Sequence, residues 1–542
     1  MKIVVAEKIS SAGQKLLASE PGWSVVTPEE YAAAPEKALA DADALIVRSA
    51  VMADDKLLEK APRLRVIGRA GVGVDNIEMA SATRRGIVVM NTPGANALAV
   101  AELTVGLMLS LARHIPRADR TTRAGKWEKK SLQGTEVNGK TLGLIGLGRI
   151  GTEVAQRARA LGMTVVASDP YVSTERAREL NVALWPIDDL YARADYISLH
   201  LGLTPQTAGF LNAAAFAKMK RGVRIVNCAR GELVDEAALH DALQSGQVAA
   251  VALDVFASEP PKNSPLLALD NVVVTPHIGG STAEAQDAVG TQIAMQVREY
   301  LLRAVVQNAV NIPSLSDVEY REMRPFMELA EKLGSLLAQL FDGNLEEIRL
   351  AYAGAISGWK TELLRSAAIV GVLRQTSSDN VNLVNASTQA QARGLHVTEE
   401  RSAESQNDVD LLGVALRNQT ATLDACGTVV RRLAAPRIIE LNGIEIESPL
   451  DGNLLVIANV DVPGVIGAVG TVLGRSGVNI ARFALGREAA QASMAAIAGK
   501  ETTGDARPTA LAMVQTDTAA PAAVIDELRQ VPGVVSVRGV LL

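Results

Sequence analysis

The clearest indication of the fold is the stretch KTLGLIGLGRIG, which runs from Lys140 to Gly151. Its first half is apolar and predicts a buried strand, and a helical stretch from Thr152 to Leu161 follows its glycines. A second apolar strand then ends at Asp169, 18 residues beyond Gly151. A strand, a glycine-rich turn, a helix and a strand closed by an acid together predict a βαβ unit that binds a dinucleotide.

Each glycine of this turn has a physical task. Gly146 permits a tight turn, Gly148 lets the backbone approach a pyrophosphate, and Gly151 allows the helix to pack closely on the strand. Arg149 and Ile150 lead into the expected helix, whose N-terminus presents unpaired N–H groups to the phosphates. The acid that closes the second strand can accept hydrogen bonds from the ribose and would repel a 2′-phosphate. We therefore expect NAD rather than NADP.

The composition is that of a globular chain. Its 542 residues are 48% hydrophobic and 21% charged, which suggests three or four domains at about 150 residues each. The net charge of −6 and an aromatic content of 3% do not favour a nucleic-acid partner. The longest apolar run, Ala97–Ala112, is shorter than the roughly 20 residues that span a membrane, so we expect a buried helix. Without a signal segment or a CxxC pair, we expect a cytoplasmic protein with no metal site.

Short apolar runs alternate with helix-length segments as far as about residue 310. They are Ala44–Val47, Leu64–Ile67, Ile87–Val89, Leu142–Ile145, Val165–Ala167, Tyr196–Leu199, Ile225–Asn227, Ala250–Leu253 and Val272–Val274. Because parallel strands need crossover connections, this rhythm predicts an α/β protein with Rossmann-like, doubly wound parallel sheets covered by helices on both faces.

Beyond about residue 315 the pattern changes to that of an α+β protein. A helical pattern at Met327–Leu340 precedes alternating strands, and Asn442-Gly443 between two such strands predicts a tight hairpin. From Asn453 onward the predicted order is βαββαβ, which is typical of a ferredoxin-like domain. We expect an elongated hairpin loop over residues 486–508.

One histidine, His277, follows an expected strand in a rigid setting, with Pro276 before it and Gly279-Gly280 after it. Removal of a hydride from a secondary alcohol needs a group that takes the hydroxyl proton, and histidine can do so near neutral pH. A carboxylate would orient the ring, and an arginine would hold a substrate carboxylate. Two other strand ends supply candidates for these roles, Glu259 and Arg230.

Four segments together resemble the D-2-hydroxyacid dehydrogenases. They are Gly146–Gly151, Val226–Glu236, Leu253–Phe256 with Glu259-Pro260, and Thr275–Gly279. The resemblance implies that His277 is the acid or base, that Glu259 is its partner and that Arg230 anchors the substrate carboxylate. It also implies that the NAD site includes Asp169, Cys228, Ala229, Asp254 and Gly279.

The same resemblance implies a domain order that periodicity does not show. A substrate-binding domain formed by residues 1–94 and 285–308 would be interrupted by an NAD-binding domain at 95–284. Separately, Asn382–Ala386 and Arg393–Leu395 resemble the intervening domain of longer members of the family, which implies an α+β intervening domain at 309–448. The ferredoxin-like pattern that follows implies a regulatory domain at 449–542.

Within that family the chain is most similar to the D-3-phosphoglycerate dehydrogenases, over essentially its whole length. This implies NAD-dependent oxidation of D-3-phosphoglycerate to 3-phosphohydroxypyruvate, the first step of L-serine biosynthesis. A phosphorylated substrate needs several cations. The substrate-binding residues implied are Arg48, Ser49, Arg69, Gly71, Val72, Gly73 and Lys129, the last reaching in from a partner subunit. Many relatives carry arginine where Lys129 stands and proline where Gly202 stands.

The C-terminal segment resembles an ACT domain, on the residues Val456–Ile466 and Ser476–Ile480. We expect its Asp-x-Pro-Gly turn to cap the start of a helix. The resemblance implies pairing between subunits in a dimer of dimers and feedback regulation by L-serine, bound at Asn459, Asp461 and Asn479. Some relatives carry histidine or tyrosine in place of Asn459, and an ACT domain that only dimerises is the alternative.

Two other functions stay open. One is a 2-hydroxyacid or hydroxypyruvate reductase without a preference for phosphate, for which Arg48 and Arg69 would matter little. The other is a regulatory protein that binds NAD and an amino acid without turnover. Such a protein would not need Arg230, Glu259 and His277 together.

Overall fold

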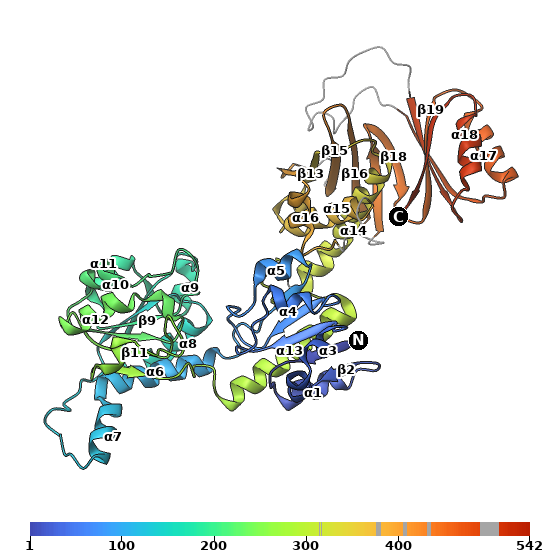
Figure 1. Ribbon diagram of the computed structural model, residues 1–542. Helices are drawn as coiled ribbons and strands as arrows, with labels where there is room; N and C mark the ends of the chain where they lie inside the picture. The colour runs from blue at the N-terminus through green and yellow to red at the C-terminus, as the bar shows by residue number, and fades with distance from the viewer. Residues whose placement is uncertain (314, 316, 376–380, 405–408, 431–434, 488–508) are drawn as a thin grey trace.

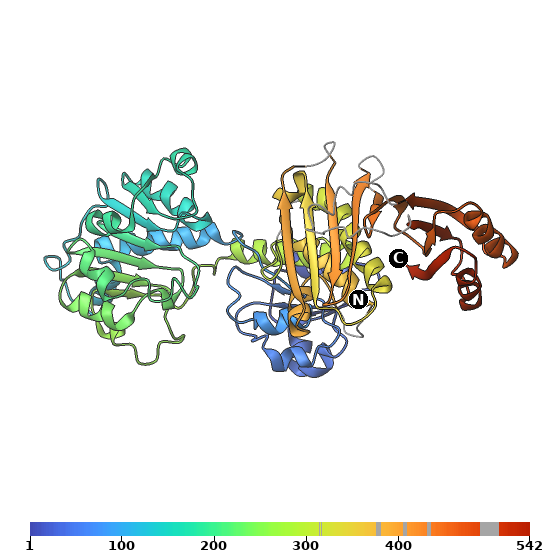
Figure 2. The same ribbon diagram turned by 90° about the horizontal axis from the view of Figure 1, so that it is seen from above.

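The chain has an elongated arrangement of four sheets that follow one another in space (Figures 1 and 2). The computed structural model describes residues 1–313, 315, 317–375, 381–404, 409–430, 435–487 and 509–542. The loop expected over residues 486–508 lies outside the described residues from 488 onward.

The first sheet is parallel, with the strand order β2-β1-β3-β4-β5. Its strands are β1 (Lys2–Val5), β2 (Ser24–Val26), β3 (Ala44–Val47), β4 (Val66–Arg69) and β5 (Val88–Met90). Helices α1 (Ser11–Ala18) and α13 (Ala283–Arg303) bury one face, and α3 (Pro35–Leu39), α4 (Asp55–Glu59) and α5 (Met79–Arg84) bury the other. The short helix α2 (Pro28–Ala33) precedes α3. The sheet is therefore doubly wound, as predicted.

The second sheet is also parallel and has the order β12-β11-β10-β9-β6-β7-β8. Its strands are β6 (Thr141–Ile145), β7 (Thr164–Ser168), β8 (Ala183–Leu184), β9 (Tyr196–Leu199), β10 (Val223–Asn227), β11 (Val248–Leu253) and β12 (Val272–Val274). The order reverses between β6 and β9, which is the point at which such sheets bind ligands.

Helices cover both faces of the second sheet. One face packs against α6 (Ala97–Arg113), α8 (Arg149–Ala160) and α9 (Thr174–Glu179), and the other against α10 (Ile187–Arg193), α11 (Ala213–Lys218) and α12 (Glu236–Gln244). Two short 3-10 helices, η1 (Gly231–Leu233) and η2 (Pro265–Ala268), lie in the connections. The chain enters this sheet after β5 and α6 and leaves it through α13, so the second sheet is an insertion into the first unit.

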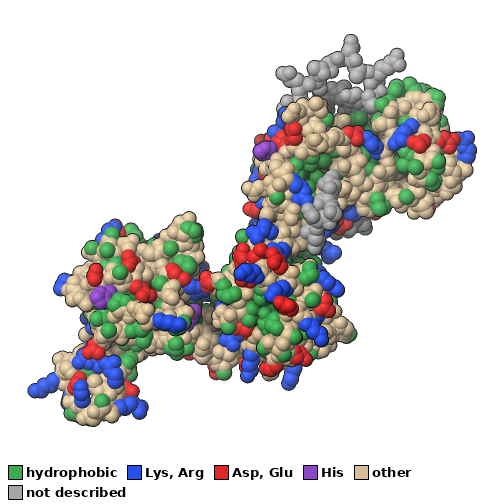
Figure 3. All heavy atoms as spheres, in the orientation of Figure 1, with side chains coloured by type: hydrophobic (Ala, Val, Ile, Leu, Met, Phe, Trp, Pro, Cys, Tyr) green, Lys and Arg blue, Asp and Glu red, His purple; other side chains and the backbone are tan. Residues whose placement is uncertain are grey.

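Among the described residues, no single helix is long and apolar enough to cross a membrane. Helices α6 and α7 (Ile115–Arg123) are long and apolar enough to do so only when taken together, and they are bent by 63° relative to each other. One side of α6 is buried against the second sheet, which confirms the expected buried helix. Helix α7 projects from this body as a separate arm that is rich in basic side chains (Figures 1 and 3).

The third sheet is mixed, with the order β14-β13-β15-β16-β17-β18. Its strands are β13 (Glu347–Ala353), β14 (His396–Ser402), β15 (Leu411–Arg417), β16 (Thr422–Val430), β17 (Ala435–Leu441) and β18 (Ile444–Pro449). Helices α14 (Asp317–Leu340), α15 (Glu362–Arg374) and α16 (Ala386–Ala392), with η3 (Ala355–Gly358), accompany it. Asn442 and Gly443 have φ values of 51° and 78°, so the predicted tight hairpin between β17 and β18 is confirmed.

The fourth sheet is antiparallel, with the order β20-β21-β19-β22. Its elements follow the predicted βαββαβ order: β19 (Asn453–Val460), α17 (Val465–Arg475), β20 (Ile480–Arg487), β21 (Thr509–Thr516), α18 (Ala522–Arg529) and β22 (Val534–Leu541). Its two helices cover one face, and the other face joins the hydrophobic core of the third sheet.

The turn before α17 differs in detail from the prediction. The residue that precedes the helix is Gly464, in a left-handed conformation, and no side chain caps the helix. The carboxylate of Asp461 instead lies 3.2 Å from Nε of Arg487. The turn therefore starts the helix through the positive φ of glycine rather than through the acid.

Candidate active site

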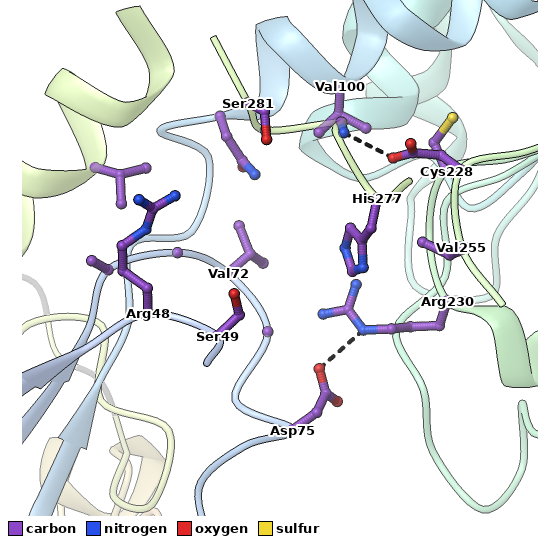
Figure 4. Close-up of a pocket in the computed structure, with 18 of the residues that line it drawn as sticks. Arg48, Ser49, Val72, Asp75, Val100, Cys228, Arg230, Val255, His277 and Ser281 are labelled. Carbon is purple, nitrogen blue, oxygen red and sulfur yellow. Dashed lines mark hydrogen bonds and ion pairs between the residues drawn. The ribbon is translucent and has the colours of Figure 1, made fainter. Parts of the chain in front are cut away.

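A cleft of about 1140 Å³ lies between the first and second sheets. Its lining includes the loops that follow β1, β3 and β4 on one side and β9, β10, β11 and β12 on the other, together with the start of α8 and part of α13. These loops leave the carboxyl ends of parallel strands, where open α/β sheets bind ligands. Figure 4 shows Arg48, Ser49 and Val72 on one side and Arg230 and His277 on the other.

His277 follows β12 on a turn with a φ of 53°. The carboxylate of Asp254, a residue only 1% exposed, accepts hydrogen bonds from Oγ1 of Thr275 at 2.6 Å and from the N–H groups of Ile278 and Gly279, both at 2.8 Å. The Asp254 carbonyl accepts the N–H of His277 at 2.8 Å. Asp254, expected in the cofactor site, therefore also holds the turn that presents His277.

Glu259 orients the imidazole of His277. Its Oε2 lies 2.8 Å from Nδ1 of His277, and its Oε1 accepts the N–H of Phe256 at 3.1 Å. Because an ionised carboxylate only accepts hydrogen bonds, Nδ1 carries the hydrogen and Nε2 is left as the proton acceptor. The His277 side chain is 52% exposed and is open to a substrate.

A second histidine, His200, also lines the cleft but is not suited to this chemistry. Burial lowers its pKa to about 4, so it is neutral and hard to protonate near pH 7. Its Nε2 lies 3.0 Å from Oγ of Ser198.

Arg230 follows β10 and lies beside His277 (Figure 4). The buried Asn227 fixes this loop, since its Nδ2 donates to the carbonyl of Arg230 at 2.8 Å and its Oδ1 accepts the N–H of Ala229 at 3.0 Å. Gly231 is required by close packing, because a Cβ there would lie 1.9 Å from the backbone of Phe256. The neighbouring thiol of Cys228 is buried, which raises its pKa to about 12.

Arg48 and Ser49 face the same cleft from the loop after β3. The carboxylate of Glu7 accepts the N–H groups of Arg48 at 2.8 Å and of Val51 at 3.0 Å. The buried Asn76 donates to the carbonyls of the same two residues, at 2.9 and 2.6 Å. These bonds tie the loop after β3 to the loop after β4.

Arg69 carries a positive charge into a mostly buried position. Burial, and secondarily the neighbouring Arg230, lower the pKa of Arg69, and its Nε has no hydrogen-bond partner among the described residues. A Cβ on Gly71 would lie 1.3 Å from Nη1 of Arg69, and one on Gly73 would lie 1.9 Å from Nη2 of Arg230. Gly71 and Gly73 therefore leave space for two guanidinium groups, and an anionic ligand would offset their mutual repulsion.

The glycine-rich turn after β6 fits NAD. Gly146 has a φ of 97°, and a Cβ on Gly151 would lie 2.4 Å from the Gly146 carbonyl oxygen, so neither position accommodates another residue easily. A Cβ on Gly148 would meet nothing within 4 Å, which leaves its backbone open to a ligand. Asp169, just after β7, accepts the N–H of Leu147 at 2.8 Å and so lies against this turn.

The other expected cofactor residues lie around this turn. Ile150 and Gly279 line the cleft, as do Cys228 and Ala229. The guanidinium of Arg149 donates to the carbonyl of Pro93, in the segment that connects the two sheets.

Other expected site residues are not brought together in one chain. Lys129 lies in the segment between α7 and β6 and does not line the cleft. In the fourth sheet, Asn459 pairs with Ala510 near one end, whereas Asn479 precedes Ile480, which pairs with Thr516 at the other end. Asn479 donates to Asp517 at 2.7 Å. Asn459, Asp461 and Asn479 therefore do not form one site within a single chain.

Four residues that line the cleft or hold its loops were not among the site residues predicted from the sequence. They are Glu7, Asn76 and Asn227, which fasten the loops, and Asp75, which pairs with Arg230. Two of them, Glu7 and Asn227, are polar residues at or within two residues of the end of a buried strand, and that local signal was available.

Comparisons with known proteins agree with this geometry. Residues 105–279 match the family described as "D-isomer specific 2-hydroxyacid dehydrogenase, NAD binding domain", and residues 322–442 match the "D-3-phosphoglycerate dehydrogenase intervening domain". The chain is 39% identical to the D-3-phosphoglycerate dehydrogenase of Methanocaldococcus jannaschii over 98% of both chains. It is 44% identical to that of Mycobacterium tuberculosis, over 83% of this chain and 85% of the relative. The chain belongs to the D-3-phosphoglycerate dehydrogenase family.

Solved structures show the same two-sheet unit in this family's wider group. The D-lactate dehydrogenase of Aquifex aeolicus, solved with NAD and lactic acid, superposes with a TM-score of 0.51 and 29% identity, over 58% of this chain and all of that chain. As a member of this family, the protein is an NAD-dependent 2-hydroxyacid dehydrogenase that acts on a small-molecule substrate.

Proposed function

We propose that this dehydrogenase oxidises D-3-phosphoglycerate to 3-phosphohydroxypyruvate, as the first step of L-serine biosynthesis. The observation that carries the proposal is the cleft in which Arg48, Arg69 and Arg230 accompany the His277–Glu259 pair. A substrate with a carboxylate at one end and a phosphate at the other matches this set of cations.

Each side chain has a role in this proposal. Nε2 of His277 takes the proton of the C2 hydroxyl, Glu259 stabilises the resulting imidazolium, and Arg230 holds the carboxylate. The chemistry that bound NAD would supply is an acceptor for the hydride that leaves C2. Arg48 and Arg69 hold the phosphate, and Ser49 with the backbone of residues 71–73 completes the pocket. Lys129 reaches the phosphate from a partner subunit.

The cofactor roles follow the placement of the turn. Gly146, Gly148 and Gly151 with the helix start at Arg149 and Ile150 hold the pyrophosphate. Asp169 receives the ribose, while Cys228, Ala229, Asp254 and Gly279 line the nicotinamide side. We also propose the domain boundaries given above. Each of the four sheets falls within one of these ranges, apart from the last residue of β18, Pro449, and α13 completes the first domain.

We also propose that the fourth sheet is an ACT-type regulatory domain that binds L-serine between two copies. The separation of Asn479 from Asn459 and Asp461 within one chain supports a site completed by a second chain. This requires a homo-oligomer, for which we propose a dimer of dimers in the cytoplasm.

Substrate identity is tested by removing the two proposed phosphate ligands. The variants Arg48→Gln and Arg69→Gln should raise the KM for D-3-phosphoglycerate by about tenfold or more, since a charge-assisted hydrogen bond contributes roughly 1.5–3 kcal/mol. The KM for D-glycerate, which lacks the phosphate, should change by less than about twofold. Arg63→Gln, an exposed position on the same body, is the matched control. Equal effects on both substrates would favour a hydroxyacid dehydrogenase without phosphate preference.

The regulatory proposal is tested by adding L-serine to the wild-type assay. Serine should lower the rate, and Asn479→Ala should remove this inhibition without changing the rate in its absence. A rate that serine does not alter would leave the fourth sheet without this effector.

A further inference from the structure

Arg230 reaches across the cleft to a carboxylate of the opposite body. Its Nε lies 3.1 Å from Oδ2 of Asp75, which belongs to the loop after β4, whereas Arg230 belongs to the loop after β10 (Figure 4). The two residues are 155 positions apart in the sequence. This ion pair therefore joins the two bodies at the place where the substrate is proposed to bind.

Two of the three guanidinium nitrogens of Arg230 donate hydrogen bonds to the protein. Nη1 donates to the carbonyl of Ala229 at 2.7 Å, and Nε donates to Asp75. The remaining nitrogen, Nη2, lies beside Gly73, where a Cβ would come within 1.9 Å of it. Because a guanidinium is planar, bonds at Nη1 and Nε fix its plane and leave Nη2 for a ligand.

The carboxylate that holds Arg230 is itself on a fastened loop. Nδ2 of Asn91 donates to the carbonyl of Val72 at 2.6 Å, and Asn76, the residue after Asp75, donates to the loop after β3. Asp75 can therefore act as a fixed point for Arg230 rather than follow it. The side chain of Asp75 is 61% exposed, so solvent weakens the charge interaction and the directional hydrogen bond matters more.

We propose that Asp75 is a positioning residue, which fixes the plane of the Arg230 guanidinium so that Nη2 is presented to the substrate carboxylate. This inference rests on the proposed role of Arg230 as the carboxylate anchor. It adds a requirement for a hydrogen-bond acceptor at position 75, and it does not require a negative charge there.

The experiment separates the acceptor from the charge. In Asp75→Ala the acceptor is lost, and we expect the KM for D-3-phosphoglycerate to rise about three- to tenfold with kcat and the KM for NAD nearly unchanged. In Asp75→Asn the amide oxygen still accepts from Nε, so the KM should be equal to or below that of the wild type. Glu36→Gln removes an exposed charge that pairs with Lys60 on the same body, and serves as the matched control.

A double-mutant cycle with Arg230→Lys completes the test. Lysine has no planar group to orient, so Asp75→Ala should have no further effect in that background. Additive losses, an unchanged KM in Asp75→Ala, or equal losses in Asp75→Asn and Asp75→Ala would overturn the inference. If the proposed function is wrong, the wild type will not turn over D-3-phosphoglycerate, which separates that failure from a failure of this inference. The KM ratios of variant to wild type would then be measured with the 2-hydroxyacid that the protein does oxidise.

Discussion

Nδ1 of His277 and Oε2 of Glu259 lie 2.8 Å apart, on the loops that follow two adjacent strands, β12 and β11. The pair is directional, since the carboxylate binds the hydrogen of Nδ1 and leaves Nε2 free to accept a proton. It therefore assigns opposite tasks to the two ring nitrogens before any substrate binds.

Replacing the histidine should remove the proton acceptor. His277→Asn should lower kcat by about 10²–10⁴-fold, which is the usual contribution of a general acid or base. The dissociation constant for NADH, measured by fluorescence titration, should change little because the glycine-rich turn is untouched. A variant with wild-type kcat would show that another group takes the proton.

Replacing its partner should have a smaller effect of the same kind. Glu259→Gln keeps the size of the side chain but removes the charge that stabilises the imidazolium. We expect kcat to fall by about tenfold to a thousandfold, with the KM for NAD unchanged. Steady-state rates over a range of both substrates provide the measurement. A fall in the affinity for NAD alone would contradict the role given to Glu259.

The acid after β7 should determine the choice between the two nicotinamide dinucleotides. In Asp169→Ala the repulsion of a 2′-phosphate is lost. The preference for NAD, measured as kcat/KM for NAD divided by kcat/KM for NADP, should therefore fall by about tenfold or more. This variant also loses the bond to Leu147, so the thermal midpoint is measured alongside. An unchanged ratio in a folded variant would remove Asp169 from the ribose contact.

The close packing of the cofactor turn predicts a steric effect. In Gly151→Ala the added Cβ would lie 2.4 Å from the Gly146 carbonyl oxygen, so the turn must shift. We expect the affinity for NADH to fall by about tenfold or more, or the protein to lose stability. Gly106→Ala, on the open side of α6, is the control and should change neither property. Unaltered affinity and stability in Gly151→Ala would contradict the packing.

The buried thiols predict how reactivity depends on pH. Burial raises the pKa of Cys228 and of Cys426 to about 12, and only the thiolate reacts with alkylating reagents. The folded protein should therefore resist iodoacetamide at pH 8, and reactivity should increase only as the pH approaches 12. Mass spectrometry should find two alkylated cysteines after unfolding in denaturant. Rapid modification of Cys228 in the folded protein would show that the cleft exposes it.

The elements of the fold could largely be predicted from local patterns. The apolar runs correspond to strands within about two residues, and Asn442-Gly443 gave the hairpin because those residue types tolerate positive φ. The helix pattern at Met327–Leu340 proved to be the second half of α14, which begins at Asp317 and continues through Pro325. The start of that helix is polar and carries a proline, so the pattern does not reveal it.

The site could be predicted in part. His277, Glu259 and Arg230 were found because each follows a strand, and strands of a parallel sheet end at one edge. Asp75 could not be found in this way. Its partner, Arg230, lies on the other side of the cleft and 155 positions away in the sequence. A local sequence pattern does not predict a contact of that kind.

The most direct test of the account is the initial rate of NADH formation by the wild-type protein with D-3-phosphoglycerate and NAD at alkaline pH, together with identification of the product. The account predicts NADH and 3-phosphohydroxypyruvate in equal amounts. It also predicts a kcat/KM at least about a hundredfold above that for D-glycerate, because the cations that hold the phosphate would have no partner on a substrate without one. No NADH with D-3-phosphoglycerate, but turnover of D-glycerate, D-lactate or D-2-hydroxyglutarate, would contradict it.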